Sequence, residues 1–270
     1  MPNEQHPWEL NSIAATNTAT GPVPNVVLKP KDGQVTIFPM SDIHIGAMAF
    51  NRELFEQFLE EADRRDAYIV LLGDTFEMAL PSHIEHSVWE QDLNPDAQLE
   101  LAIEYLKPRK DRIIISTGGN HDARVWKKTG VDIARVLSRE LGCFYNRNGG
   151  YFKVSVGAQT YTWSIFHGAQ ASVNPFTEME KRLAVYDESD IIAMGHNHQL
   201  CFKAVVKKRI QEGSEERHLV YLLRTGSFIS EPEYSRNALY SPTLEGCPIV
   251  ELSAKTRAVY IDVHGEALWH

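Results

Sequence analysis

The sequence has few cysteines, and their spacing excludes two kinds of site. Only Cys143, Cys201 and Cys247 occur among 270 residues, and no two of them form a CxxC pair. Such a set supports neither a disulfide framework nor a thiolate zinc site. Sparse cysteine is also typical of a reducing compartment, so we expect a cytoplasmic protein.

Long apolar runs and an excess of basic residues are missing as well. The longest apolar runs, such as Tyr68–Leu72, have the length of a strand, whereas a membrane helix needs about 20 apolar residues. We therefore expect no membrane partner, and residues 1–24 lack the basic and apolar regions of a secretory signal. With 27 Lys and Arg against 36 Asp and Glu, the net charge is −9. This balance argues against a non-specific nucleic-acid binder, but it allows an enzyme with a local basic groove.

The length and composition fit one large globular domain. Residues 1–34 are predicted to be a polar N-terminal tail and lead-in, because the first 24 are rich in Asn, Thr, Ala and Pro. Residues 35–270 are predicted to form a single domain, since no internal repeat or convincing linker divides them.

The first half of this domain alternates between strands and helices. Apolar runs and helical periodicity predict strands at 35–40, 68–72 and 113–116 and helices at 52–65, 96–106 and 131–141, with a long loop at 80–95. The second half is dominated by strands, predicted at 151–156, 160–166, 191–194, 200–209, 219–223, 249–252 and 258–263, with one helix at 175–186. We expect an α/β fold with four layers, α/β/β/α, in which two mixed sheets pack face to face and helices lie outside.

Polar clusters follow five of the predicted strands, at the point where each strand ends. The clusters contain Asp42 and His44; Asp74; Asn120, His121 and Asp122; His167; and His196 and His198. Ligands of α/β sheets bind outside the carboxyl ends of the strands, so these clusters can meet at one place. Their oxygen and imidazole groups suit divalent cations such as Mn, Fe, Co, Ni or Zn. Two such ions, bridged by one carboxylate, would clamp a phosphate and hold an acidic water for attack on phosphorus.

The same clusters, in the same order, resemble the signature of the calcineurin-like metallophosphoesterase superfamily. The superfamily pattern is DxH, GDxx(D/E), GNH(D/E), a lone His and GHxH, and the match spans roughly residues 35 to 200. Each motif alone is a weak indicator of the superfamily, but all five motifs in this order are highly specific for it. The motifs are Asp42-Ile-His44, Gly73-Asp74-Thr-Phe-Glu77, Gly119-Asn120-His121-Asp122, His167, and Gly195-His196-Asn-His198.

The resemblance implies a role for each of these residues. Two divalent ions would be bound, with Mn favoured and Zn, Fe, Ni or Co as alternatives. Asp42, His44 and His198 would hold the first ion, Asn120, His167 and His196 the second, and Asp74 would bridge both. His121 would face the phosphate and protonate the leaving oxygen, and Asp122 would orient His121. Glu77 stands where many members have Asp, and we expect it to support the site without binding metal.

The resemblance also implies a hydrolase of phosphate esters. A diesterase is favoured over a monoesterase, because the Asn-His-Asp form and the Asp-x-His-x-Gly opening also occur in nucleases of this superfamily. The expected partner is therefore a phosphate ester of nucleotide or nucleic-acid type. The alternatives are a non-catalytic metal-binding or scaffolding module of the same fold, and a phosphomonoesterase or protein phosphatase. The sequence leaves the oligomeric state open.

Three basic residues after the Asn-His-Asp cluster are candidates for substrate binding. Arg124, Lys127 and Lys128 could grip a second phosphate or a nucleic-acid backbone. The alternative is an ordinary solvated face. For the loop at 80–95, the sequence allows either a lid over the site or a contact between subunits.

Overall fold

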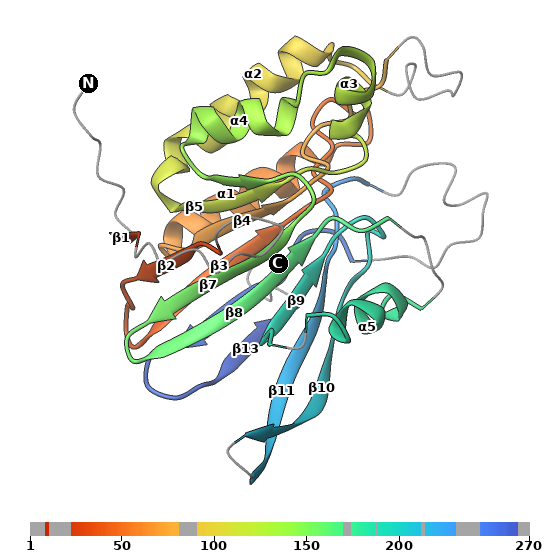
Figure 1. Cartoon of the computed structure of the whole chain (residues 1–270). Helices are drawn as coiled ribbons and strands as arrows, with labels where there is room; N and C mark the ends of the chain where they lie inside the picture. The colour runs from red at the N-terminus through yellow and green to blue at the C-terminus, as the bar shows by residue number, and fades with distance from the viewer. Residues whose placement is uncertain are drawn as a thin grey trace.

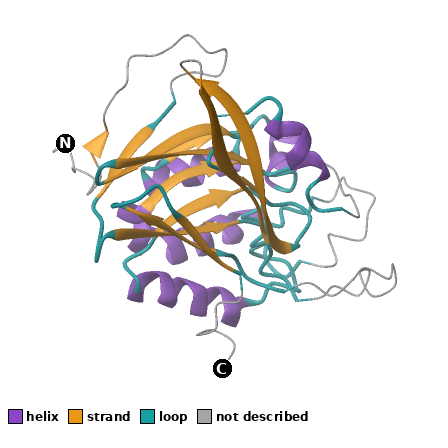
Figure 2. Ribbon diagram, turned by 90° about the horizontal axis from the view of Figure 1, so that it is seen from below, coloured by secondary structure: helices purple, strands orange, loops and turns teal. Residues whose placement is uncertain are grey.

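The computed structural model describes residues 9–10, 23–80, 91–169, 174–186, 188–211, 214–230 and 244–263. These residues form two β-sheets that pack face to face, with helices on the outer faces (Figures 1 and 2). The expected four-layer α/β sandwich of two mixed sheets is confirmed. Within the described part of the chain, no helix combines the length and the apolar character needed to cross a membrane.

The first sheet has six strands and carries the parallel core of the fold. Its spatial order is β13 (Val259–Asp262), β12 (Ile249–Ser253), β3 (Gln34–Met40), β4 (Tyr68–Leu72), β5 (Ile113–Thr117) and β6 (Phe144–Asn146). Strands β3 to β6 run parallel, whereas β12 and β13 are antiparallel to their neighbours.

The second sheet has seven strands and is also mixed. Its order is β1 (Glu9–Leu10), β2 (Asn25–Leu28), β7 (Gly150–Val156), β8 (Gln159–Phe166), β9 (Ile191–Met194), β11 (Ser214–Thr225) and β10 (Leu200–Gln211). Strands β8, β9 and β11 run parallel, and the two hairpins β7–β8 and β10–β11 are antiparallel. Strand β2 pairs with β7, so the segment assigned to the lead-in contributes a strand to the sheet.

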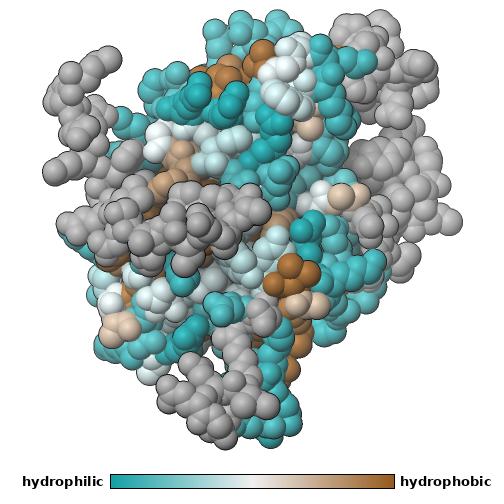
Figure 3. Space-filling view, in the orientation of Figure 1, coloured by the Kyte–Doolittle hydropathy of each residue, from teal (hydrophilic) through white to brown (hydrophobic). Residues whose placement is uncertain are grey.

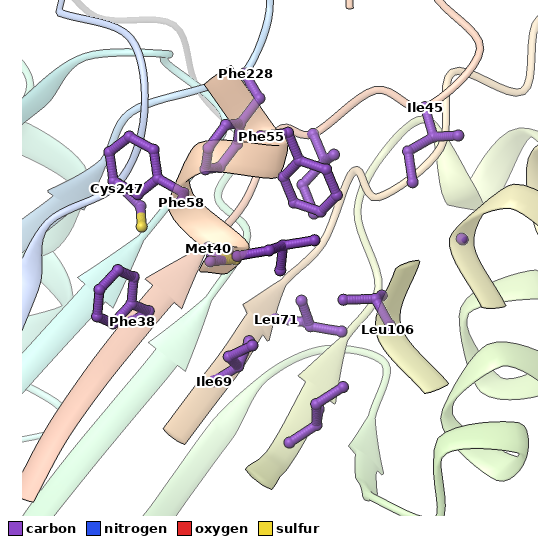
Figure 4. Packing of buried hydrophobic residues seen from close by; sticks show 14 of the residues in the cluster. Phe38, Met40, Ile45, Phe55, Phe58, Ile69, Leu71, Leu106, Phe228 and Cys247 are labelled. Carbon is purple, nitrogen blue, oxygen red and sulfur yellow. The ribbon is translucent and has the colours of Figure 1, made fainter. Parts of the chain in front are cut away.

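The alternation of side chains along β3 explains how the six-stranded sheet is covered on both faces. Phe38 and Met40 pack with Phe55 and Phe58 in the layer of helices, as Figure 4 shows. Ile37, on the opposite face, belongs to the apolar core between the two sheets. The helices over this sheet are α1 (Arg52–Arg64), α2 (Pro95–Leu106) and α4 (Ile133–Leu141), whereas α5 (Thr177–Leu183) packs on the outer face of the seven-stranded sheet.

Several boundaries differ from the sequence prediction, and local contacts explain them. Helix α2 begins one residue earlier than predicted, because Asn94 caps it by accepting a hydrogen bond from Ala97 N. Helix α4 begins at Ile133 because Asp132 accepts from Arg135 N. Helix α5 is shorter than predicted, the β10–β11 hairpin is longer, and β6 was missed.

One further helix, α3 (Asp122–Thr129), was also missed, because it is short and buries only one of its residues, Asp122. It follows the Asn-His-Asp cluster directly, so it starts at the candidate site. Residues 81–90, which make up most of the predicted loop at 80–95, lie outside the described residues. The two roles expected for this loop, a lid or a contact between subunits, therefore stay predictions.

Candidate metal centre

The loops that follow five strands meet at one edge of the sandwich. Asp42 and His44 follow β3, Asp74 follows β4, Asn120 follows β5, His167 follows β8, and His196 and His198 follow β9. The first two loops are joined by backbone hydrogen bonds. Asp42 N donates to Gly73 O at 3.1 Å, and His44 N donates to Asp74 O at 3.1 Å. The side chains of these loops are therefore held in a fixed relative position.

Backbone strain concentrates in the same loops. Among the described residues, eight non-glycine residues have positive φ, and five of them are predicted metal ligands. The left-handed region is unfavourable for residues with a Cβ, and such strain clusters at functional sites. The five are Asp42 (φ 50°), His44 (54°), Asp74 (48°), His196 (74°) and His198 (54°).

Two motif glycines allow the loops to approach each other closely. A Cβ on Gly119 would collide with Asp74 Oδ1, and a Cβ on Gly195 would collide with Asp42 Oδ2 and the side chain of Ser41. The glycines of the Gly-Asn-His and Gly-His-x-His motifs are thus required by the space between neighbouring carboxylates.

The first predicted ligand set forms a compact group. One ligand atom each from Asp42, His44 and His198 lies within 4.8 Å of the others. His198 Nε2 lies 3.2 Å from Asp42 Oδ1, and His44 Nε2 lies 3.9 Å from it. Asp42 Oδ1 and His44 Nε2 are both buried and have no hydrogen-bond partner. Buried polar atoms without partners are rare, and here two of them lie 3.9 Å apart, which fits a bound cation.

The second predicted set forms another group. Asp74, His167 and His196 each place a ligand atom within 4.8 Å of the others. Asn120 Oδ1 lies between the two histidines, 2.9 Å from His167 Nε2 and 2.9 Å from His196 Nδ1. The other nitrogen of His167 lies 2.9 Å from Leu72 O, which fixes the ring and leaves Nε2 facing the group.

Asp74 lies between the two groups. Its Oδ2 is 3.0 Å from His167 Nε2, and it also falls in a third group with His44 and His121. Its Oδ1 accepts a hydrogen bond from His121 N at 2.8 Å. A single carboxylate is therefore within reach of ligands from both sets.

Buried histidines and carboxylates lie against one another at the site, and this shifts their pKa values. Burial alone would lower the pKa values of His44 and His167, but the surrounding carboxylates outweigh it and raise them to about 10 and about 9. Burial alone would raise the pKa of Asp42, but the neighbouring His198 and His167 hold it well below its usual value. Because metal ligands must be deprotonated, metal binding here would displace these protons.

Glu77 joins three side chains of the site, which its sequence position did not reveal. Its Oε2 lies 3.0 Å from His44 Nδ1 and 3.2 Å from His121 Nδ1, and its Oε1 accepts from Arg124 Nη1 at 2.8 Å. It therefore touches His44 on the side away from the candidate ligand atom. The Gly-Asp-x-x-Glu spacing indicated that Glu77 belongs to the site. It did not indicate which histidines Glu77 contacts.

Asp122 has a different set of contacts from the expected one. We expected it to orient His121, but its carboxylate accepts hydrogen bonds from the backbone N–H groups of Gly119, Asp74 and Phe76. Burial and then the negative charge of Asp74 raise the pKa of Asp122 to about 7. Asp122 thus ties two ligand loops together, and Glu77 is the residue that lies against His121.

The three basic candidates separate in the structure. Arg124 donates to Glu77 O and Oε1 at 2.8 Å, and its Nη2 lies 3.2 Å from His121 Nε2. Lys127 and Lys128 are exposed on α3 and form no ion pair with any described residue. Only Arg124 is therefore part of the inner network of the site.

Arg224, on β11, is a supporting residue that the sequence analysis missed. It is almost fully buried, and it donates to Gly195 O at 2.6 Å and to Pro175 O at 2.7 Å. It thereby fixes the loop that carries His196 and His198. An arginine at the end of an apolar strand was the only signal in the sequence.

The chain is similar to one known protein family and to several solved structures. The model of the calcineurin-like phosphoesterase family matches residues 35–200. No curated protein matches the chain. Similar solved structures include a metallophosphoesterase from Sphaerobacter thermophilus, 17% identical over 84% of this chain and 87% of its own, with a TM-score of 0.43. A predicted phosphoesterase from Streptococcus pneumoniae (18% identity, 85% and 90% covered, TM-score 0.36) and Vps29 from Entamoeba histolytica complexed with Zn (14%, 84% and 97%, 0.35) are also similar.

Proposed function

Because the chain belongs to the calcineurin-like phosphoesterase family, we propose that it is a metal-dependent hydrolase of phosphodiesters. The observation that carries the proposal is the position of Asp74, between a group with His44 and a group with His167 and His196. One carboxylate between two sets of ligands is the arrangement needed for a pair of divalent ions.

The donor set fits two ions, with Asp42, His44 and His198 holding one, Asn120, His167 and His196 the other, and Asp74 shared. Carboxylate, amide and imidazole donors without thiolates suit Mn, Fe, Co, Ni or Zn, and we favour Mn. Ions bound at such a site supply Lewis-acid polarisation of a phosphoryl oxygen and lower the pKa of water.

His121 is the residue that we assign to the leaving group. Its Nδ1 lies 3.1 Å from Glu77 O and 3.2 Å from Glu77 Oε2. Both partners are acceptors, so the proton of the neutral ring is assigned to Nδ1 and the lone pair to Nε2. A proton taken up by Nε2 is then available to the leaving oxygen. In the neutral ring Arg124 Nη2, 3.2 Å away, donates to Nε2, so protonation of Nε2 releases the guanidinium to face the phosphate.

A diester of nucleotide type is the substrate class that we propose. It is supported by the Asn120-His121-Asp122 form and the Asp42-x-His44-x-Gly46 opening, which this chain shares with nucleases of the superfamily. The exposed lysines of α3, Lys127 and Lys128, add positive charge beside the site in a chain whose net charge is −9.

The test is hydrolysis of bis-p-nitrophenyl phosphate by protein stripped of metal and reloaded with Mn, Zn, Fe, Co or Ni. We expect Mn-dependent release of p-nitrophenol, faster than from p-nitrophenyl phosphate. Asp74→Asn should lose metal and activity together. Asp190→Asn is the matched control, because Asp190 is buried and paired with Arg257 away from the site.

Two results would count against this function. If no metal supports hydrolysis of either ester while Asp74→Asn binds metal as well as the parent, the proposal fails. If metal binds at the predicted ligands without any turnover, the non-catalytic alternative is favoured. A clear preference for the monoester would overturn the assignment of the substrate class alone.

A further inference from the structure

Two buried hydroxyl groups lie behind the predicted metal ligand Asp42. Ser41 and Thr225 are 1% and 0% exposed, and their hydroxyl oxygens are 2.6 Å apart, although 184 positions of the chain separate them. Hydrophilic residues predominate on the face seen in Figure 3, where water can satisfy them, but a buried hydroxyl needs a partner within the protein. The partners of this pair lead to the candidate site.

The hydrogen bonds of the pair run in one direction. The Ser41 hydroxyl donates to Asp42 Oδ2, and a serine hydroxyl has one proton to donate. The proton between Ser41 and Thr225 is therefore assigned to Thr225, whose other acceptor, Met194 O, is more distant at 3.3 Å. Thr225, Ser41 and the Asp42 carboxylate thus form a chain in which each hydrogen bond strengthens the next.

This chain gives the two carboxylate oxygens of Asp42 different roles. Oδ2 accepts from the Ser41 hydroxyl and from His196 N at 2.8 Å. Oδ1 is buried without a hydrogen-bond partner among the described residues, and it lies 3.2 Å from Nε2 of His198, a member of the first ligand set. Because donors occupy Oδ2, Oδ1 is the oxygen left to bind an ion. The carboxylate is therefore oriented before any ion binds.

The backbone that follows Thr225 holds the same loop. Phe228 N donates to Asp42 O at 3.0 Å, and Asn51 N donates to Phe228 O at 2.8 Å. Residues 225–228 lie beyond residues 35–200, which the family model matches. A part of the chain outside the five motifs therefore positions the aspartate of the first motif.

We propose that Ser41 and Thr225 are positioning residues that set the affinity of the first ion, the one expected at Asp42, His44 and His198. The inference rests on the two-ion site of the proposed function, but ion binding is measured without turnover. The alternative is that the hydroxyl pair only joins β11 to the loop after β3. Its loss would then lower stability and leave ion binding unchanged.

The test is calorimetric titration of Mn into metal-stripped protein, in which we expect one binding event for each ion. His198→Ala removes a ligand of the first set and so identifies the event that belongs to that ion. Ser41→Ala removes a donor to a metal-binding carboxylate, so it should weaken this event by about 10- to 100-fold and leave the other event unchanged.

Two substitutions of Thr225 separate its hydroxyl from its shape. Thr225→Val keeps the shape and removes one neutral hydrogen bond, so it should weaken the same event by up to about 10-fold. Thr225→Ser keeps the hydroxyl, so it should bind both ions as the parent does. If Ser41→Ala does not fold, these two variants decide the test.

Ser189→Ala is the matched control. Ser164 and Ser189 form another buried hydroxyl pair, also with 2.6 Å between the oxygens. Ser189 precedes β9, whereas His196 and His198 follow it, so this pair lies away from the ligands. Ser189→Ala should lower the unfolding temperature without changing either binding event, and thermal unfolding also shows whether each variant is folded.

Equal weakening of both events in Ser41→Ala or Thr225→Val, or no weakening of either, would overturn the positioning role. A Thr225→Ser variant as weak as Thr225→Val, or a parent with a single binding event, would overturn it as well. If the protein hydrolyses model diesters but the variants bind both ions as the parent does, only the positioning role fails. If it hydrolyses nothing but the first event depends on Ser41 and Thr225, the positioning role stands and the hydrolase proposal fails.

Discussion

Replacing Glu77 with glutamine tests how the site is held together. The carboxylate lies 3.0 Å from His44 Nδ1, 3.2 Å from His121 Nδ1 and 2.8 Å from Arg124 Nη1. Glutamine has the same length but no charge, and its NH₂ group must face either the histidines or the guanidinium, all of which donate. At least one contact therefore becomes a donor against a donor.

The magnitude follows from the kind of bond that is lost. A hydrogen bond to a charged group contributes about 1.5–3 kcal/mol, and partners that orient a metal-binding histidine change affinity or activity by about 10- to 100-fold. We expect Glu77→Gln to weaken metal binding through His44 by about 10- to 100-fold. The value of kcat/KM at saturating metal should fall as well, because His121 loses the same partner.

The assay is calorimetric titration of Mn into metal-stripped protein, followed by turnover of bis-p-nitrophenyl phosphate. Glu61→Gln is the control, because Glu61 is as buried as Glu77, at 7% exposure, but it pairs with Arg64 and Arg65 at the C-terminal end of α1. If Glu77→Gln bound metal and turned over substrate as the Glu61→Gln control does, the positioning role derived from these distances would be refuted.

Three other changes test separate parts of the site. In metal-free protein, carboxylates outweigh burial and raise the pKa values of His44 and His167 to about 10 and about 9. Their stabilisation is full below about pH 6.5 and lost as the pH rises through 9 to 10. The urea midpoint of EDTA-treated protein should therefore fall from pH 7 to pH 10, and fall less in His167→Asn; an equal fall in both would contradict the assignment. Gly119→Ala should lower the bound metal and cost about 1–3 kcal/mol of stability, because the added Cβ collides with Asp74; unchanged metal content on elemental analysis would argue against the close approach. His121→Ala should lower kcat by about 100- to 10,000-fold while metal content stays the same, and an equal loss of metal would make His121 a ligand.

Much of the fold could be predicted from periodicity in the sequence. Strands β3, β4 and β5 and helix α1 have strong apolar patterns, because each buries at least one face in a core. Helix α3 and strand β6 could not be predicted in this way. Asp122 is the only buried residue of α3, and the residues of β6 are only partly buried, so neither segment carries a clear pattern.

The sequence by itself determined which side chains lie at the ends of the strands. A buried strand can be recognised from its apolar residues, and this fixes the position of a ligand residue that directly follows it. Asp42, Asp74 and Asn120 could be placed together for this reason. Only the tertiary structure decided which groups support them. Glu77 meets His44 across 33 positions and Arg124 across 47 positions of the chain. Contacts of that kind depend on how two loops are packed and on the rotamers of long side chains, and neither is encoded in local spacing.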